Sequence, residues 1–312
     1  MNFSLTQLEY VLAIDNYRHF AKAADACLVT QPTLSMQLKK LEEELGFELF
    51  DRTKQPIIPT DAGKIIIEQA RTILRETKKL EHIAQTFDNS FDGNFSVGII
   101  PTIAPYLLPY FLGDFIKKYP NIRLHLQELK TEEIIFKLNK DELDAGILAT
   151  PLHESNLIEE PVFYEEIKLY AHYKHLLSNK KNLKPDDIMR PDIWMLTEGN
   201  CFRNQIINIC TQPQEITKHL HYDSGSLETL KKMVDMEGGF TLLPELAVLE
   251  LSNKKQEQIS EFRKPKPLRE ISLVYARSVA KMKYIHVLKK LIQESIPDYL
   301  QNKKRGTVVE WK

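Results

Sequence analysis

Two of the three cysteines lie in one short stretch, GNCFRNQIINIC at residues 199–210. Cys201 and Cys210 are nine residues apart, which is wider than a thioredoxin-type C-x-x-C motif, and no second C-x-x-C completes a zinc site. A secreted protein held together by disulfides has more cysteines in a shorter chain. We therefore expect no metal and no cofactor. Two interpretations of the pair remain: two packed side chains, or two thiols that react with each other.

A helix between the two cysteines would keep them apart. Nine residues of α-helix advance the chain by about 13 Å and turn it by about 900°, so the side chains point to opposite faces. A disulfide requires Cα atoms within about 7 Å of each other. Closing the bond would therefore unwind residues 202–209, whose two asparagines and three isoleucines make a weak helix.

The two thiols also differ in their expected surroundings. Cys201 would lie at the N-terminal end of the helix with Arg203 nearby, and both features favour a thiolate. Cys210 would lie at the opposite end, where the helix dipole acts the other way. On this interpretation Cys201 attacks peroxide and Cys210 resolves the resulting sulfenic acid.

The bulk composition is that of an ordinary globular protein with room for two or three domains. The chain has 312 residues, 43% hydrophobic and 27% charged, with a formal net charge of -1 that points to no particular partner. The N-terminus lacks a signal-peptide pattern, and no apolar run could span a membrane. We expect a cytoplasmic protein without a membrane partner, in which a disulfide is transient.

The first sixty residues carry the pattern of a helix–turn–helix. The alanine-rich stretch 20–28 predicts a short helix, and a longer one follows from Thr30, a suitable N-cap, to Gly46, a suitable stop. The apolar stripe of the longer helix consists of Leu34, Leu38, Leu41 and Leu45. Its outer face, with Lys39 and Lys40, would enter a major groove. A hairpin of two helices with a solvated face is the alternative, and 11 Lys/Arg against 13 Asp/Glu in residues 1–90 do not decide between them.

A long helix is predicted after Pro59. Its apolar residues alternate spacings of four and three, as in a coiled-coil seam. The seam consists of Ile66, Ala70, Ile73, Thr77, Leu80, Ala84 and Phe87. Because the seam is narrow, it favours a second copy of the helix over packing on the chain's own domain, which needs a wider stripe.

From residue 95 the pattern changes to short β-rich runs between helices at 106–118 and 132–139. The runs lie at 95–100, 122–127, 144–148, 167–173, 192–196, 217–222 and 271–276. This alternation predicts an α/β fold with parallel sheets, and its length of about 200 residues favours two lobes with a cleft. Residues 303–312 have the composition of a poorly ordered tail.

The stretch FAKAADACLVTQPTLSMQLKKLEEELGFELFDRT resembles the winged helix–turn–helix of the LysR-type transcriptional regulators, with its Q-P-T-L-S, L-E-x-E-L-G and L-F-x-R motifs. The resemblance implies an all-α, winged DNA-binding domain at 1–59, a linker and dimerisation helix at 60–90, and a two-lobed regulatory domain at 91–302 that is similar to periplasmic solute-binding proteins. The implied contacts to operator DNA are Thr30, Gln31, Pro32, Thr33, Ser35, Lys39, Arg52 and Thr53.

The stretches at 98–109, 199–210, 221–234 and 238–248, together with the cysteine spacing, resemble the OxyR peroxide sensors, a LysR subgroup. In that subgroup the first cysteine reacts with hydrogen peroxide and the second closes a reversible disulfide. The implied peroxide-pocket residues are Thr102, Thr131, Asn200, Asn204, His221 and Arg269. Two of them depart from the pattern, since Asn200 replaces a histidine and Asn204 an acidic residue.

The resemblance also implies the partners: operator DNA, RNA polymerase, a cellular thiol reductant, and further copies of the chain in a homodimer or homotetramer. Alternatives from other classes are a LysR regulator with a small metabolite in its cleft and a thiol peroxidase that uses Cys201. A periplasmic binding protein would fit the two lobes but not the DNA-binding head.

Overall fold

The computed structural model describes residues 3–86, 92–209, 225–277, 279 and 281–311. The chain divides into two compact units: unit 1 is Met1–Ser90 with Ser278–Lys281, and unit 2 is Phe91–Arg277 with Met282–Lys312. Among the described residues, no helix combines the length and apolar character that a membrane crossing requires.

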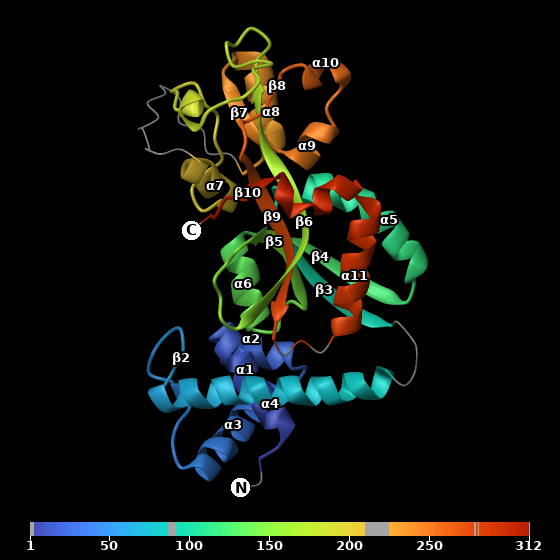
Figure 1. The fold of residues 1–312 in the computed structure, drawn as a ribbon. Coiled ribbons are helices and arrows are strands. Elements are labelled where there is room, and N and C mark those ends of the chain that lie inside the picture. Colours follow the sequence, from blue (N-terminus) through green and yellow to red (C-terminus); the bar gives the residue numbers. More distant parts are fainter. Residues whose placement is uncertain (1–2, 87–91, 210–224, 278, 280, 312) are drawn as a thin grey trace. The chain divides into compact units, whose positions relative to one another are not determined.

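Unit 1 is a helical domain with a small wing (Figure 1). Its elements are α1 (Leu5–Tyr17), α2 (Phe20–Ala26), α3 (Gln31–Leu45), β1 (Phe50–Asp51), β2 (Ile58–Pro59) and α4 (Asp61–Thr86). The side chain of Thr30 accepts a hydrogen bond from the Thr33 N–H at the start of α3, and Gly46 ends the helix with φ +83°. The predicted helix–turn–helix is therefore present, and β1 pairs antiparallel with β2 to form the wing.

The predicted seam on helix α4 has two parts, which differ in what they pack against. Ile67 and Ala70 are buried in the core of unit 1, and Ile66 and Ile73 pack against the same core. The N-terminal part of the seam thus lies largely on its own domain, because the core formed by α1–α3 offers it an apolar face. Leu80 is 69% exposed. Phe87 lies outside the described residues.

Unit 2 is an α/β domain built on one connected set of strands. Its strands are β3 (Gly93–Ile99), β4 (Ile122–Glu128), β5 (Ala145–Thr150), β6 (Leu157–Ala171), β7 (Phe240–Pro244), β8 (Ile259–Ser260), β9 (Lys266–Ala276) and β10 (Gly306–Val308). Its helices are α5 (Ala104–Lys118), α6 (Thr131–Asn139), α7 (Cys201–Ile209), α8 (Leu227–Glu237), α9 (Glu245–Leu249), α10 (Asn253–Gln256) and α11 (Met282–Ser295), with 3-10 turns η1 (Pro185–Ile188), η2 (Asp298–Gln301) and η3 (Lys303–Arg305).

The strand order β4-β3-β5-β9-β6-β7 is mixed, so the prediction of parallel sheets is wrong in part. Strand β3 pairs parallel with β4 and β5, whereas β9 runs antiparallel to both β5 and β6. The first part of β6 pairs with β9 and its last five residues pair with β7. The long strands β6 and β9 therefore join two groups of elements within the unit (Figure 1).

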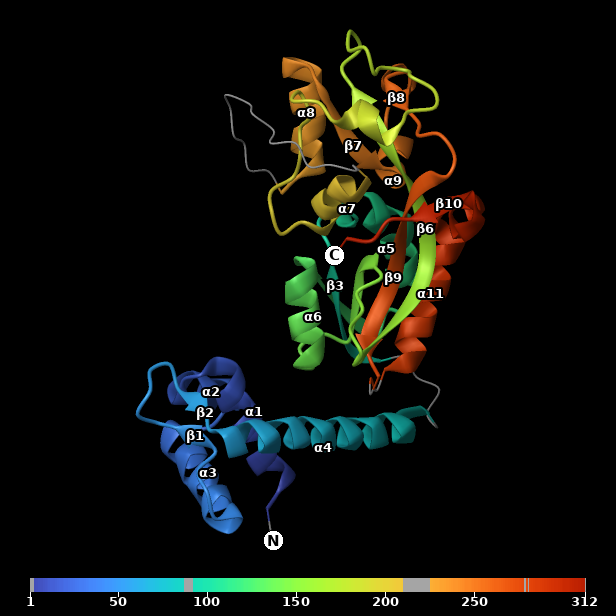
Figure 2. The same cartoon turned by 60° about the vertical axis from the view of Figure 1, so that its left-hand side comes forward.

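Three expectations for unit 2 need correction or fall outside the description. The run at 192–196 forms only an isolated bridge between Ile193 and Phe240, and the run at 217–222 is not described. The tail prediction for residues 303–312 is wrong, because η3 and β10 follow one another there, β10 pairs parallel with β9, and Trp311 is buried. Figure 2 shows the end of this segment beside α7.

Candidate functional site

Cys201 is the first residue of α7 and is only 5% exposed. Asn200 starts the helix: its side-chain oxygen accepts a hydrogen bond from the Phe202 N–H at 3.1 Å, and its carbonyl accepts one from the Asn204 N–H at 3.3 Å. The helix lies between the two cysteines as predicted. Cys201 therefore lies at the end of the helix that carries a positive partial charge.

Arg269 connects Cys201 to the end of β3. Its guanidinium is fully buried; Nη2 donates a hydrogen bond to Thr102 Oγ1 at 2.6 Å and lies 3.8 Å from Cys201 Sγ. The guanidinium also lies over the Phe202 ring, 5.0 Å from its centre. Within the described part of the chain, Arg269 Nε has no hydrogen-bond partner. The thiol therefore has a permanent positive charge beside it.

Glu165 is the buried acid next to Arg269. It lies on β6 directly across from Arg269 on β9, and Arg269 Nη1 is 3.4 Å from Glu165 Oε1. Its other oxygen accepts a hydrogen bond from the Leu246 N–H at 3.2 Å. Burial raises the pKa of the Glu165 carboxyl to about 7; Arg269 and Leu246 oppose the rise, and the charge of Glu245 adds to it.

Thr131 is the first residue of α6, is 4% exposed, and has a hydroxyl without a partner among the described residues. Lys130, just before it, places its ammonium 3.9 Å from where a Cβ on Gly199 would lie. The start of α6 therefore lies against the loop that leads into α7. Thr102 lies in the turn between β3 and α5, and Thr131 is the first residue of α6, just as Cys201 is the first residue of α7.

The structure corrects the role expected of Arg203. Its guanidinium donates a hydrogen bond to the Leu196 carbonyl at 2.9 Å, so Arg269, 68 residues after Cys201 in the chain, supplies the charge at the sulfur instead. Cys210 and His221 lie outside the described residues. Asn204 is half-buried, and its backbone N–H donates to the Asn200 carbonyl.

Two contributors to the site escaped the sequence analysis: Glu165 and the C-terminal segment. Gln205 on α7 is fully buried and donates from Nε2 to the Val309 carbonyl at 2.9 Å, and Asn208 donates to the Glu310 carbonyl at 2.8 Å. The segment 306–311 therefore binds both β9 and α7. The β-branched residues Thr307, Val308 and Val309 were the available signal for this strand.

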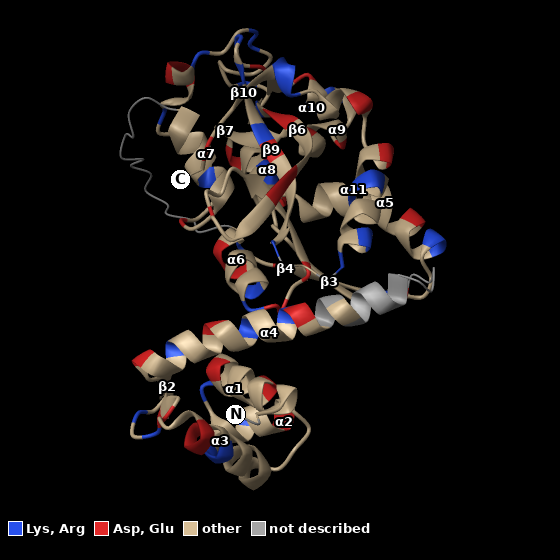
Figure 3. Ribbon diagram, turned by 60° about the horizontal axis from the view of Figure 1, so that its bottom comes forward, with Lys and Arg blue, Asp and Glu red and all other residues tan. Residues whose placement is uncertain are grey.

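The predicted DNA contacts of α3 lie together at its start and on its outer face. Gln31, Pro32 and Lys39 are exposed, and Thr33 and Ser35 are half-buried. The hydroxyls of Thr30 and Thr33 are 2.8 Å apart and form a hydrogen bond. Figure 3 shows Lys and Arg interspersed with Asp and Glu along α3 and α4.

The wing residues are held by unit 1 itself. Arg52 Nη2 is 2.5 Å from Glu42 Oε2, and the same buried carboxylate accepts a hydrogen bond from the Leu49 N–H. Thr53 donates from both its N–H and its hydroxyl to Asp51 Oδ1. These bonds fix the start of the wing, so Arg52 and Thr53 have a structural role in addition to the DNA contact expected of them.

Comparisons with known proteins agree on one family. The model for the bacterial regulatory helix-turn-helix proteins of the lysR family matches residues 5–64, and the model for the LysR substrate binding domain matches residues 88–296. The hydrogen peroxide-inducible genes activator of Dickeya chrysanthemi is 38% identical over 278 residues, 87% of this chain and 89% of that protein. OxyR of Escherichia coli, a DNA-binding transcriptional dual regulator, is 37% identical over 272 residues, with the same 87% and 89% coverage.

Solved structures lead to the same group. A full-length OxyR variant from Pseudomonas aeruginosa has a TM-score of 0.77 at 31% identity and covers 95% of this chain and 99% of that one. A hydrogen peroxide-bound OxyR variant from Corynebacterium glutamicum has a TM-score of 0.62 at 25% identity and covers 100% of this chain and 99% of that one. The chain therefore belongs to the LysR family of regulators and, within it, to the OxyR group.

Proposed function

We propose that this chain is a transcriptional regulator that senses hydrogen peroxide through Cys201 and reports it through its DNA-binding unit. The observation that carries this proposal is the buried Cys201 sulfur, 3.8 Å from the Arg269 guanidinium, at the start of a helix. The relatives described above are named for peroxide-inducible gene activation, and one of the similar structures holds hydrogen peroxide.

The chemistry proceeds in two balanced steps. The Cys201 thiolate attacks one peroxide oxygen; the O–O bond breaks, an S–O bond forms, and the second oxygen leaves as hydroxide and is protonated to water. The Cys210 thiolate then attacks the sulfenic sulfur; the S–O bond breaks, the S–S bond forms, and the first oxygen leaves as hydroxide, which is protonated to a second water. A cellular dithiol resets the protein by exchange. Thr102 and Arg269 hold the reacting end, with Thr131, Asn200, Asn204 and His221 completing the proposed pocket.

Helix α7 prevents the disulfide until it unwinds. Cys201 and Ile209 bound one continuous helix, which separates their Cα atoms by about 12 Å. Because consecutive Cα atoms are about 3.8 Å apart, a residue that directly follows Ile209 cannot bring its Cα closer than about 8 Å to that of Cys201 while α7 stays intact. A disulfide needs less than about 7 Å. Oxidation must therefore break part of α7, and with it the bonds to Val309 and Glu310.

In the proposed response, this change in unit 2 alters how copies of the chain pack and so how α3 and the wing bind operator DNA. Exposed residues on α4, such as Leu80, offer a surface for a second copy in a homodimer or homotetramer. RNA polymerase is the proposed downstream partner, and the two groups of elements in unit 2 form the two lobes of a regulatory domain. The reset reaction suits a reducing cytoplasm.

The test treats reduced protein with one equivalent of peroxide and maps its cysteine-containing peptides. We expect a sulfenic acid on Cys201 that converts to the Cys201–Cys210 disulfide, and Cys210→Ser should trap the oxidised Cys201. Cys27 is the internal control, because burial and the charge of Glu9 raise the pKa of its thiol and disfavour its thiolate. Free thiols at both positions after peroxide treatment would rule out the proposal.

Turnover separates the sensor from an enzyme. A sensor consumes about one peroxide per disulfide formed, whereas a thiol peroxidase with its reductant consumes many. DNA binding by the full-length chain, measured before and after oxidation, completes the test. An affinity for DNA that neither falls with salt nor changes with oxidation would contradict the regulatory part of the proposal.

A further inference from the structure

Two groups that can carry a negative charge lie beside the same guanidinium in unit 2. Arg269 Nη2 is 3.8 Å from Cys201 Sγ, and its Nη1 is 3.4 Å from Glu165 Oε1. Arg269 is 0% exposed, Glu165 1% and Cys201 5%, so water screens none of the three groups effectively. A buried charge needs a partner of opposite sign, and one arginine fully compensates only one anion.

We infer that Glu165 is a positioning residue for the peroxide reaction, which holds Arg269 in place and competes with the Cys201 thiolate for its positive charge. This inference rests on the proposed function, since it concerns the thiol that reacts there. When Glu165 is ionised, Arg269 is neutralised from the β6 side and the thiolate gains less. When Glu165 carries a proton, the thiolate is the only anion beside the guanidinium.

The geometry leaves Glu165 few other partners. Strand pairing fixes it opposite Arg269, and its second oxygen faces the Leu246 N–H at the start of α9. The other charged group that acts on it from α9 is Glu245, whose negative charge disfavours ionisation of Glu165. From α5 the group that senses Glu165 is the phenol of Tyr106. Arg269 is thus the cation that decides the state of Glu165.

Two negative charges beside one guanidinium disfavour each other, so a charge on Glu165 leaves less of the positive charge of Arg269 for the sulfur. A pKa of Glu165 raised to about 7 by burial places its protonation change in the range where the thiol must be ready to react. The reactivity of Cys201 should then respond to pH through Glu165 as well as through its own proton.

Glu165→Gln tests this, because the amide keeps the shape and one acceptor oxygen of the carboxylate but cannot carry the negative charge. The rate of alkylation of Cys201 by iodoacetamide is followed across pH in full-length protein, by mass spectrometry of the Cys201 peptide. Removing the competing anion should move the midpoint of the profile to lower pH and raise the rate near pH 6 by about tenfold, as expected for one neighbouring charge.

Glu270→Gln is the matched control. Glu270 is the next residue on β9, is 8% exposed, and accepts a hydrogen bond from Thr150 while pairing with Lys303. Its side chain points to the other face of the sheet. Glu270→Gln should keep the wild-type midpoint of the alkylation profile. Glu165→Asp keeps the negative charge, so its midpoint should lie close to that of the wild type. An unchanged midpoint in Glu165→Gln overturns the inference.

If Glu165→Gln does not fold, the reciprocal experiment still decides. By linkage, Cys201→Ser should let Glu165 ionise at lower pH, and the pH dependence of unfolding should move with it. Identical pH dependence in Cys201→Ser and wild type overturns the inference. Alkylation and unfolding need no peroxide, so a chain that fails to sense peroxide could still support or refute this role of Glu165.

Discussion

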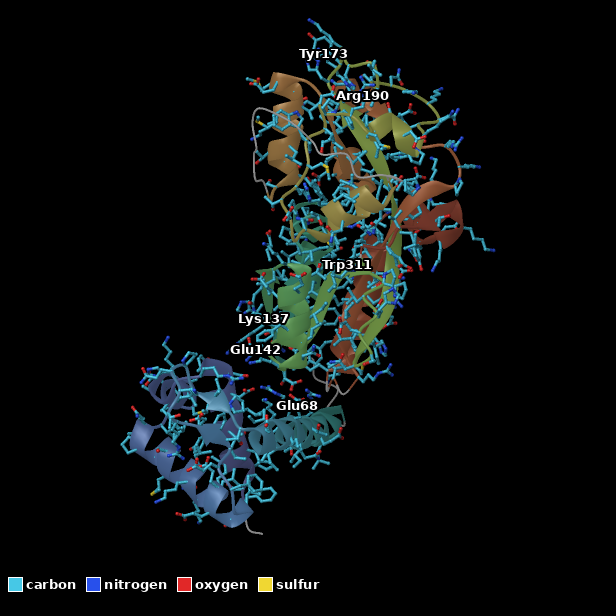
Figure 4. All side chains as sticks on the ribbon, turned by 90° about the vertical axis from the view of Figure 1, so that its left-hand side faces the viewer. Glu68, Lys137, Glu142, Tyr173, Arg190 and Trp311 are labelled. Carbon is cyan, nitrogen blue, oxygen red and sulfur yellow. The ribbon has the colours of Figure 1, made fainter. Side chains whose placement is uncertain are left out.

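Replacing Trp311 by alanine tests whether the C-terminal segment holds the redox helix. Trp311 is 5% exposed and follows the two residues whose carbonyls accept hydrogen bonds from Gln205 and Asn208 on α7. Figure 4 labels it among the packed side chains in the middle of unit 2. The change removes the indole and leaves the backbone of the segment intact.

The expected cost follows from burial. A buried tryptophan removes about 150–250 Å² from water, worth about 4–6 kcal/mol at about 25 cal/mol per Å². Measured Trp→Ala changes in protein cores cost about 3–5 kcal/mol. The loss cannot exceed the free energy that docks the segment, because a segment that detaches has nothing more to lose. We therefore expect about 3–5 kcal/mol, much of the stability of an ordinary domain.

Urea unfolding followed by tryptophan fluorescence measures this cost. Both tryptophans, Trp194 and Trp311, lie in unit 2, so the signal reports that unit alone. Amide exchange across α7 should accelerate in the variant, and the Cys201–Cys210 disulfide should form faster, because the helix loses its docked partner. Tyr299→Ala is the control: Tyr299 is 44% exposed and contacts Arg305, so its loss should cost no more than about 1 kcal/mol. A Trp311→Ala cost below about 1 kcal/mol, with α7 exchange unchanged, would refute the reasoning.

Three further predictions concern the pH response, the oligomer and DNA binding. The pKa of Glu165 rises from 4.5 to about 7 on folding, so its contribution to the free energy of unfolding is fully present below about pH 4.5 and is lost as the pH rises through about 7. The loss is of the order of 3 kcal/mol. Glu165→Gln should abolish this loss when unfolding is measured across pH. Leu80 is exposed, so Leu80→Lys should dissociate the oligomer in a sedimentation experiment without changing the unfolding of unit 1. Ile73 packs on the core, so Ile73→Lys should unfold unit 1. Thr33→Ala should weaken specific DNA binding by about 1–3 kcal/mol, and Lys39→Ala should weaken binding to all sequences and reduce its salt dependence, as measured by titration at several salt concentrations.

Local sequence signals predicted the elements whose boundaries depend on their own residues. Helix α3 runs from the Thr30 cap to the Gly46 stop, and α7 begins at Cys201, as the pattern indicated. Capping and glycine act within a few residues, so a linear reading finds them. The seam of α4 was harder, because the same apolar spacing serves a partner helix and the chain's own core, and only the packing of Ile66 and Ile73 distinguishes them.

The charges at Cys201 depend on contacts between distant segments. Arg203 was the cation nearest in sequence, yet its side chain is engaged by Leu196, and Arg269 reaches the sulfur from β9. Periodicity alone could not find Arg269 or Thr102; the family resemblance did. Glu165 escaped both approaches, because its importance comes from the strand register that sets it opposite Arg269.

The C-terminal strand was missed because its composition is polar and charged before the short run TVVEW. Gly306 marks the start of this strand, but the reason for a glycine there is visible only in the structure. A Cβ on Gly306 would lie 2.0 Å from the Lys266 carbonyl oxygen, so no other residue fits where β10 meets β9. A short strand of this kind gains its stability from the partner it joins, not from its own propensity.

The distance along the chain between α7 and its partners has a consequence for newly made protein. Arg269 follows Cys201 by 68 residues, and Val309 follows Gln205 by 104. At about 5–20 residues per second, the ribosome needs about 5–20 s after making α7 to supply the strand that docks on it. A nascent chain thus carries Cys201 for seconds without its guanidinium and without the docked strand. Fast reaction of Cys201 with peroxide should therefore begin only after synthesis passes Arg269, so shorter chains should respond poorly to the oxidant.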